Sequence, residues 1–365
     1  MKTAIYSTHK FEQAYLHNAN NGKHDLVLFE ESLSENTVQL AQDCQAICIF
    51  VGDKANSKVL NRLQDMGIKC IALRSAGYNH VDVAEAKKLG IKLARVPEYS
   101  PYSVAEHTVA LMLALNRKIV HAHNRINELN FSLDGLVGFD MHKKTVGIIG
   151  TGKIGRQVAK ILYGFGCTLL AYDTIENEAL KKYTGIEYLD LETLCKQADI
   201  ISLHLPLNET SAHIIDKNSI GDMKKGVMLI NTSRGGLVDT VDVVDALKSG
   251  KIGYFGMDVY EEEEGLFFQD HSDDILQDDV IERLMTFKNV LITSHQAFLL
   301  PSSATADLRA SSSKSTNKIS APSSKNNLAV VFPMLPAPPV MMAVLFVSFF
   351  MLNFILEFEF YVIKY

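Results

Sequence analysis

One segment in the middle of the chain, TVGIIGTGKIGRQVAKILYGFGCTLLAYD (residues 145–173), constrains the fold more than any other. Gly150, Gly152 and Gly155 directly follow an apolar run with the pattern of a strand, and they open an amphipathic, helix-like run. A second apolar run then ends in Asp173. This order of strand, glycine turn, helix, strand and terminal acid is that of a dinucleotide-binding βαβ unit, so the segment predicts NAD binding.

Each residue of this motif is needed at its position for a physical reason. Gly150 makes the tight turn, Gly152 lets the backbone approach a pyrophosphate, and Gly155 lets the helix pack closely on the strand. The pyrophosphate would lie at the helix N-terminus, where free N–H groups favour an anion. Asp173 would accept hydrogen bonds from the adenosine ribose and repel a 2′-phosphate, which favours NAD over NADP. The alternative is a strand, turn and helix that need glycines only for packing.

Apolar, β-rich runs alternate with amphipathic segments on both sides of this motif. They cover residues 3–7, 25–30, 46–51, 69–75 and 91–96 before it, and 199–205, 227–233, 254–259 and 290–294 after it. This alternation is typical of parallel sheets covered by helices. Residues 102–125 lack Gly and Pro and predict one long, mostly buried helix. We therefore predict an α/β fold of two doubly wound parallel-sheet domains, at 1–100 and 101–298.

The overall composition argues against several classes of protein. The chain has 47% hydrophobic and 21% charged residues, as globular proteins do, and a net charge of -6 without a basic stripe, which argues against nucleic-acid binding. Its five cysteines show no C-x-x-C and no zinc spacing, so we expect reduced core cysteines and no metal site. Neither His121 nor His123 offers metal spacing, and we expect His107 to be a satisfied core histidine. The N-terminus lacks a signal-peptide pattern, so we expect a cytoplasmic location.

The composition changes abruptly at Leu299. Residues 299–339 form a Ser/Pro-rich, low-complexity tail, and residues 340–365 are apolar and rich in aromatics. A helix over the uncharged residues 340–356 would span about 25 Å, short of the roughly 30 Å hydrocarbon core, so a membrane tail anchor is a weak candidate. Two other hypotheses remain open: an artefact such as a frameshift or an unremoved intron, and a substitute packing element.

Three later segments place polar residues just past predicted strands, where open α/β sheets bind ligands. These are NTSRGGLVD, GMDVYEEEEGLFF and VLITSHQAF. Together with AIYSTHK, IALRSAGYNHVD, RVPEYSPYSVAEH and GTGKIG, they resemble the D-isomer-specific 2-hydroxyacid dehydrogenase family over roughly residues 1–298. The resemblance implies a flavodoxin-like catalytic domain, a Rossmann NAD-binding domain and a cleft between them.

The resemblance also implies a catalytic set. Arg234 would bind the substrate carboxylate and polarise the carbonyl, which suits a planar, always charged guanidinium. His295 would give a proton to the carbonyl oxygen while hydride reaches the carbon. Glu263, the match to the pattern V-Y-E-x-E, would pair with His295 and orient it, while the rest of residues 261–264 would form a solvated acidic loop. The alternatives are a surface salt bridge for Arg234 and a structural role for His295.

Further contacts follow from the same resemblance. The implied cofactor contacts, besides the glycines, Asp173 and Arg234, are Lys153, Ile154, Leu205, Pro206, Thr232, Ser233 and Asp258. Substrate contacts would come from Gly77, Tyr78, Tyr99 and Arg234. Phe298 would limit the size of the pocket and favour pyruvate, unless it is a core aromatic.

The implied activity is the reversible reduction of pyruvate to D-lactate by a homo-oligomer, with a dimer expected. One alternative is another enzyme of the family, acting on glyoxylate, hydroxypyruvate or a larger 2-oxo acid. A second is a non-catalytic NAD-binding scaffold, as in corepressors that resemble the family. In the family the chain after H-x-A-F normally forms a helix that completes the first domain, but here residues 299–339 show no sustained helical stripe.

Overall fold

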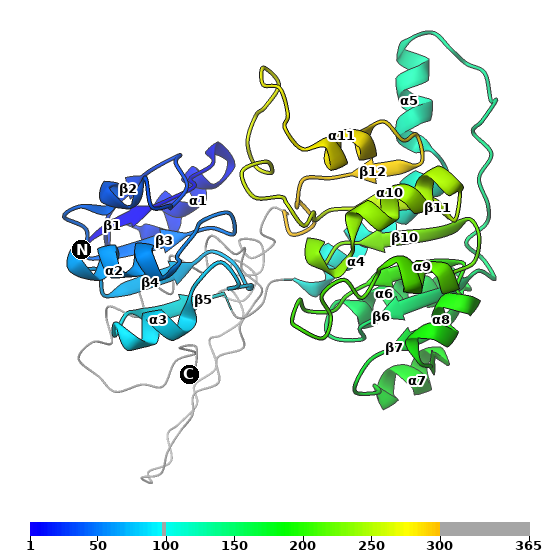
Figure 1. Ribbon diagram of the computed structural model, residues 1–365, viewed down its shortest axis with the longest axis horizontal. Coiled ribbons are helices and arrows are strands. Elements are labelled where there is room, and N and C mark those ends of the chain that lie inside the picture. The colour runs from blue at the N-terminus through cyan, green and yellow to red at the C-terminus, as the bar shows by residue number, and fades with distance from the viewer. Residues whose placement is uncertain (97–99, 300–365) are drawn as a thin grey trace, which may run out of the picture. The chain divides into compact units, whose positions relative to one another are not determined.

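The computed structural model describes residues 1–96 and 100–299 (Figure 1). The chain divides into one compact unit that begins at Met1 and runs to Tyr99, and a second over Ser100–Leu299. The predicted tail segments from residue 300 onward, and Tyr99, lie outside the described residues.

The first unit carries a five-stranded parallel sheet within residues 1–96. Its elements are β1 (Lys2–Ile5), α1 (Lys10–Asn20), β2 (Asp25–Leu28), the 3-10 helix η1 (Val38–Ala41), β3 (Ala46–Ile49), α2 (Ser57–Asp65), β4 (Cys70–Leu73), α3 (Val83–Lys88) and β5 (Lys92–Arg95). Strands β3 and β4 are buried at every position, which explains why AICI and CIAL are continuous apolar runs. The order β2-β1-β3-β4-β5 is that of flavodoxin-like folds.

A fully buried ion pair fixes the end of β4. Arg74 directly follows this strand, and its Nη2 donates to the carbonyl oxygens of Tyr6 at 2.8 Å and Ser7 at 2.9 Å. The same Nη2 lies 3.1 Å from Oε1 of Glu12, and both side chains are 0% exposed. Because a buried charge is costly unless it is paired and hydrogen-bonded, these contacts hold the start of the loop that carries Gly77.

The second unit carries a seven-stranded parallel sheet within residues 100–299. Its elements are α4 (Pro101–Asn116), α5 (Ile119–Asn127), β6 (Thr145–Ile149), α6 (Gly155–Gly164), β7 (Thr168–Tyr172), α7 (Glu178–Thr184), β8 (Glu187–Tyr188), α8 (Leu191–Gln197), β9 (Ile200–Leu203), α9 (Lys217–Asp222), β10 (Val227–Asn231), the 3-10 helix η2 (Gly235–Leu237), α10 (Thr240–Ser249), β11 (Ile252–Met257), α11 (Asp279–Met285) and β12 (Val290–Ile292). The strand order is β12-β11-β10-β9-β6-β7-β8, the Rossmann order with an added edge strand.

Helices cover both faces of this second sheet. One core packs α4, α6 and α7 against the sheet, and the other packs α8, α9, α10 and α11 against it (Figure 1). The direction of strand addition reverses between β6 and β9, and such a switch point is where open α/β sheets bind nucleotides. The predicted fold class, two doubly wound parallel-sheet α/β domains, is confirmed.

The predicted long helix over residues 102–125 is wrong in one respect, because the chain breaks into α4 and α5. Lys118 adopts a left-handed conformation at φ +50° between them. Just before the break, the Asn116 side chain donates to the carbonyl oxygen of Phe139 at 2.7 Å and accepts from its N–H at 2.8 Å. This pairing with a distant loop ends the buried part of the helix.

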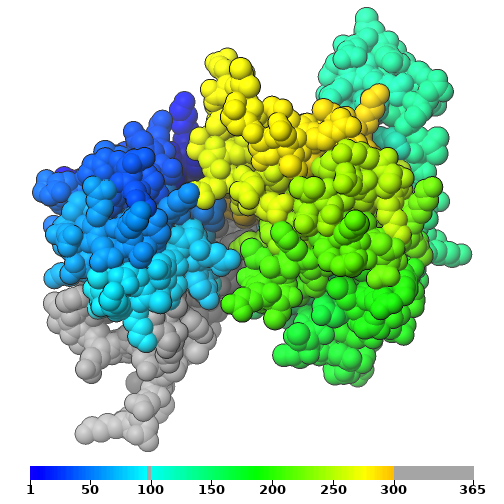
Figure 2. Space-filling model, in the orientation of Figure 1, coloured from blue at the N-terminus to red at the C-terminus, as the bar shows by residue number. Residues whose placement is uncertain are grey.

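Beyond the break, α5 and the following loop form an arm, residues 119–137, that stands out from the second unit (Figure 2). No residue of α5 is buried. The arm exposes large apolar side chains, namely Ile119, Val120, Ile126, Leu129, Phe131, Leu133 and Val137.

Two further observations concern the cysteines and the helices of the described residues. All five cysteines are buried and none forms a disulfide, as the sequence predicts. Across residues 1–96 and 100–299, no helix combines the length and the apolar character needed to cross a membrane.

Candidate active site

The carboxyl edge of the second sheet gathers the predicted cofactor and catalytic residues. Because all its strands are parallel, the residues that follow them lie along one edge. These residues are Gly150 after β6, Asp173 after β7, Leu205 after β9, Arg234 after β10, Asp258 after β11 and His295 after β12.

The glycine loop fits a dinucleotide pyrophosphate. Gly150 has φ +97°, and a Cβ there would lie 2.7 Å from the carbonyl oxygen of His204. A Cβ on Gly155 would lie 1.9 Å from the carbonyl oxygen of Gly150, so strand and helix meet too closely for any other residue. A Cβ on Gly152 would meet nothing within 4 Å, so the backbone at that position is open to a ligand at the start of α6.

The Asp173 carboxylate is fixed and ionised. Its Oδ2 accepts from the N–H of Thr151 at 2.6 Å and from the Thr151 hydroxyl at 3.0 Å. The Tyr188 hydroxyl in turn donates to Thr151 Oγ1 at 2.9 Å. Burial alone would raise the pKa of Asp173, but the bonds from Thr151 outweigh it and hold the pKa below its usual range. A preorganised carboxylate at the end of β7 is the group that a ribose diol requires.

His204 lies directly beneath the glycine loop and is half-buried in its neutral form. Its N–H donates to the carbonyl oxygen of Ile149 at 2.7 Å, and its Nε2 contacts the Ser202 hydroxyl at 2.9 Å. Its Nδ1 is buried without a hydrogen-bond partner in the described part of the chain. Burial lowers the pKa of His204 to about 3.

This burial predicts acid lability of the second unit. Below the ordinary histidine pKa of about 6.5, the unfolded chain binds a proton that the folded chain refuses until about pH 3, so stability falls with pH over that window. The variant His204→Gln keeps a polar atom near Ser202 but has no histidine to protonate. We therefore expect its free energy of unfolding to fall less steeply with decreasing pH than that of the wild type, by up to about 1.4 kcal/mol per pH unit. Urea unfolding at pH 7, 6 and 5 measures this free energy. Equal pH slopes for the variant and the wild type would contradict the assignment.

His295 and Glu263 form a hydrogen-bonded pair. His295 Nδ1 lies 2.9 Å from Glu263 Oε1, and the two side chains are 12% and 27% exposed. The other oxygen of Glu263 accepts from the N–H of Tyr260 at 3.1 Å. The neighbouring Glu261 instead contacts His213 at 3.0 Å. Of residues 261–264, Glu263 is therefore the one that the structure brings to His295.

Two aromatic rings flank His295. The ring of Phe298 meets it edge-on at a centroid distance of 6.2 Å, and the ring of Phe268 lies at 5.8 Å. His295 and Phe268 both have left-handed backbones, at φ +47° and +67°, and such conformations gather at functional sites. Phe268 was not singled out from the sequence, although it stands in the segment GLFF directly after the glutamates.

Arg234 stands on a loop that packs closely on the glutamate loop. A Cβ on the next residue, Gly235, would lie 2.0 Å from the carbonyl carbon of Tyr260, so only glycine permits this approach. The Arg234 guanidinium donates to the carbonyl oxygen of Ser233 at 2.6 Å. Within residues 1–96 and 100–299, Arg234 forms no salt bridge with a carboxylate, so the salt-bridge alternative finds no support there.

The other predicted cofactor residues lie around the same edge. The Ser233 hydroxyl donates to the carbonyl oxygen of Leu205 at 2.6 Å, and Thr232 Oγ1 lies 2.7 Å from Thr108 Oγ1. Lys153 and Pro206 are exposed and Ile154 is half-buried, whereas Asp258 is fully buried.

The predicted substrate contacts Gly77 and Tyr78 belong to the first unit. The carbonyl oxygen of Gly77 accepts from the Ser75 hydroxyl at 2.6 Å, which fixes the loop after β4. The guanidinium of Arg95 lies over the Tyr78 ring at 5.4 Å. Tyr99 lies outside the described residues.

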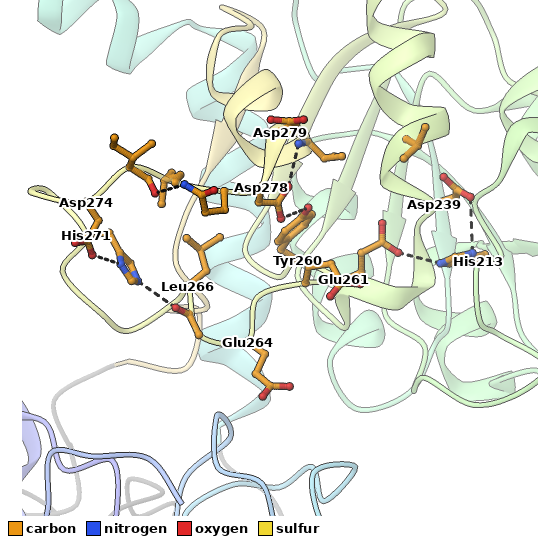
Figure 3. Close-up of a pocket in the computed structure, with 17 residues that line it drawn as sticks. His213, Asp239, Tyr260, Glu261, Glu264, Leu266, His271, Asp274, Asp278 and Asp279 are labelled. Carbon is orange, nitrogen blue, oxygen red and sulfur yellow. Dashed lines mark hydrogen bonds and ion pairs between the residues drawn. The ribbon is translucent and has the colours of Figure 1, made fainter. Parts of the chain in front are cut away.

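A cavity of about 1000 Å³ lies beside the glutamate loop (Figure 3). Its lining is acidic, and in Figure 3 His213 lies between Asp239 and Glu261, at 3.8 and 3.0 Å from their carboxylates. Neither Arg234 nor His295 lines this cavity, so it is separate from the candidate active site.

Comparison with known proteins gives a consistent result. The profile of the family described as D-isomer specific 2-hydroxyacid dehydrogenase, NAD binding domain, matches residues 109–297. The D-lactate dehydrogenase of Escherichia coli (strain K12) is 48% identical over 307 residues, covering 84% of this chain and 93% of the relative.

Two solved structures are similar as well. The pyruvate reductase of Chlamydomonas reinhardtii matches with a TM-score of 0.77 and 44% identity, over 82% of this chain and 90% of that one. The D-lactate dehydrogenase of Lactobacillus jensenii with NAD+ matches with a TM-score of 0.66 and 34% identity, over 82% and 91%. The predicted cofactor, NAD, is confirmed by this match and the family profile. The chain therefore belongs to the D-isomer specific 2-hydroxyacid dehydrogenase family and is an NAD-dependent oxidoreductase.

Proposed function

We propose that this enzyme reduces pyruvate to D-lactate. NADH, when bound, supplies the hydride that adds to the carbonyl carbon. His295 gives the proton to the carbonyl oxygen, so pyruvate, NADH and one proton yield lactate and NAD+. The observation that carries the proposal is the 2.9 Å hydrogen bond that His295 Nδ1 donates to Glu263 Oε1, which leaves Nε2 as the nitrogen that exchanges the proton.

The two other charged groups have complementary roles in this proposal. Arg234 binds the pyruvate carboxylate, for which its planar fork offers two parallel N–H donors. Glu263 holds the imidazole in one orientation and stabilises the imidazolium that forms when lactate is oxidised. Tyr260 donates its N–H to the second oxygen of Glu263, which keeps that carboxylate in place through the cycle.

The side chain of the substrate is proposed to meet the aromatic rings around His295. The ring centroids of Phe268 and Phe298 lie 5.8 and 6.2 Å from that of the imidazole, and this crowding supports a 2-oxo acid as small as pyruvate. The D-lactate dehydrogenases among the relatives support the same choice. Gly77, Tyr78 and Tyr99 remain the proposed contacts from the first unit.

Substrate preference tests this proposal. We expect kcat/KM for pyruvate to exceed that for phenylpyruvate by more than about tenfold, because the larger side chain would clash with the rings. Phe298→Ala is expected to narrow this ratio by about tenfold or more, and Phe165→Ala, the same change at the end of α6, is expected to leave it unchanged. Steady-state NADH oxidation over a panel that includes glyoxylate and hydroxypyruvate measures these ratios. A wild-type preference for hydroxypyruvate or phenylpyruvate would contradict the pyruvate assignment.

We also propose that the enzyme is a homo-oligomer, with a dimer as the expected form. The exposed arm supports this, because Leu129, Phe131 and Leu133 are 80%, 69% and 80% exposed, and large exposed apolar patches mark interaction surfaces. Sedimentation of the full chain is expected to give a dimer, and the double change Phe131→Glu with Leu133→Glu is expected to give monomers. Tyr183→Glu on α7 serves as the exposed control. A monomeric wild type at micromolar concentration would exclude the proposal.

A further inference from the structure

We propose that His107, on α4, is a positioning residue for the catalytic histidine. It acts on the turn of residues 293–297, here named the catalytic turn, through Asp258 and Thr293. The inference rests on the proposed acid-base role of His295. His107 looks from the sequence like an ordinary core histidine, but its ring contacts the groups that hold His295.

Asp258 is the anchor of the catalytic turn. This residue is 0% exposed, and its Oδ1 accepts from the Thr293 hydroxyl at 2.6 Å and from the N–H of Gln296 at 2.9 Å. Its Oδ2 accepts from the N–H of Ala297 at 2.9 Å, and its carbonyl oxygen accepts from the N–H of His295 at 2.7 Å. One buried residue thus binds four members of a turn only five residues long.

His107 completes this arrangement from α4. Its Nε2 lies 3.0 Å from Thr293 Oγ1 and 3.4 Å from Asp258 Oδ1. Four residues earlier, on the same face of the helix, the Ser103 hydroxyl donates to the carbonyl oxygen of Ala297 at 2.6 Å. Two consecutive turns of α4 are therefore bonded to opposite ends of the catalytic turn.

The direction of each hydrogen bond follows from the chemistry of the groups. Burial would raise the pKa of Asp258, but the bonds from His107, Thr293 and the catalytic-turn backbone outweigh it and hold the pKa below its usual range, so the carboxylate is ionised and only accepts. The Thr293 hydroxyl therefore gives its one proton to Asp258 and can only accept from His107. It follows that His107 carries a proton on Nε2, the nitrogen that faces the pair.

This arrangement counters the strain in the catalytic turn. His295 is held at φ +47°, a conformation that is uncommon for residues other than glycine and persists where the surroundings impose it. If the anchor shifts, the imidazole moves relative to Glu263 and to the substrate. A misplacement of about 1 Å can cost about 100-fold in rate.

The experiment compares two replacements of His107 in the full chain. His107→Leu removes the Nε2 donor, whereas His107→Gln places an amide N–H near the same point. We expect His107→Leu to lower kcat for pyruvate about 10- to 100-fold, with the Kd for NADH within about threefold of wild type, and His107→Gln to restore kcat to within about fivefold of it. His123→Leu, on exposed α5, is the matched control and is expected to retain wild-type kcat.

A second pair of variants keeps the test decisive if His107→Leu fails to fold. Thr293→Val removes the hydroxyl between His107 and Asp258, and Thr293→Ser keeps it, so only the first is expected to lower kcat. Wild-type kcat in His107→Leu and Thr293→Val, or equal losses in His107→Leu and His107→Gln, would overturn the positioning role. The variant His295→Asn separates the two proposals. Full activity of His295→Asn would contradict the acid-base role of His295. An inactive His295→Asn alongside a fully active His107→Leu would contradict only the positioning role of His107.

Discussion

Replacing His295 by Asn is expected to lower kcat for pyruvate reduction by about 10³-fold, since a positioned general acid contributes about 10² to 10⁴. Asparagine can keep a contact with Glu263 but cannot deliver a proton to the carbonyl oxygen. The Kd for NADH, measured by fluorescence titration, is expected to stay within about threefold of wild type, because the glycine loop and Asp173 are untouched. A variant that retains more than about a tenth of wild-type kcat would contradict the role of His295.

The glutamate run provides a matched control for this expectation. Glu263→Gln keeps the shape of the side chain but removes the charge that stabilises the imidazolium, so we expect a loss in kcat of about 10- to 100-fold. Glu262→Gln makes the same change one residue away on an exposed side chain and is expected to have no effect. Equal losses in the two variants would mean that the acidic loop acts through its total charge and not through the contact to His295.

The second large effect is expected at Arg234. Arg234→Leu removes the charge for the substrate carboxylate, and the loss of such a contact costs about 4 kcal/mol, or about 10³-fold in kcat/KM for pyruvate. Arg234→Lys is expected to recover only part of this, because an ammonium cannot make two parallel bonds to a carboxylate. Arg283→Leu on α11 controls for the loss of a positive charge. Steady-state kinetics with pyruvate give kcat/KM for all three variants. An unchanged kcat/KM in Arg234→Leu would contradict the role of Arg234 in binding the substrate.

Local patterns in the sequence were sufficient for the glycine loop and for every described strand except the two-residue β8, which carries no apolar run. Glycines at fixed spacing after an apolar run have few uses, and the structure shows why Gly150 and Gly155 admit no side chain. Continuous apolar runs such as AICI mark strands that are covered on both faces. These signals lie within a few residues of one another, which is why a sequence pattern reports them.

Contacts between distant segments could not be predicted in the same way. The break between α4 and α5 follows a bond from Asn116 to Phe139, and the sequence over residues 102–125 carries no sign of it. Phe268 reaches His295 from a long irregular loop that has no periodicity to read. Nothing in the segment around His107 indicates that its partners lie after β11 and β12.

The four consecutive glutamates combine a local sequence pattern with a contact between distant segments. The sequence pattern favours Glu263, but spacing alone cannot tell which carboxylate reaches a histidine 32 positions away. The fold separates them: Glu261 turns to His213 and the N–H of Thr240, while Glu263 turns to His295.

The proposed reduction of pyruvate to D-lactate is tested by identifying the product of one reaction. The purified full chain is incubated with pyruvate and NADH, NADH oxidation is followed by absorbance, and the lactate is resolved by chiral chromatography. We expect D-lactate in equal amount to the NADH consumed, and turnover about 10³-fold slower with His295→Asn. NADH binding without oxidation by pyruvate or any other 2-oxo acid, or formation of L-lactate, would contradict it.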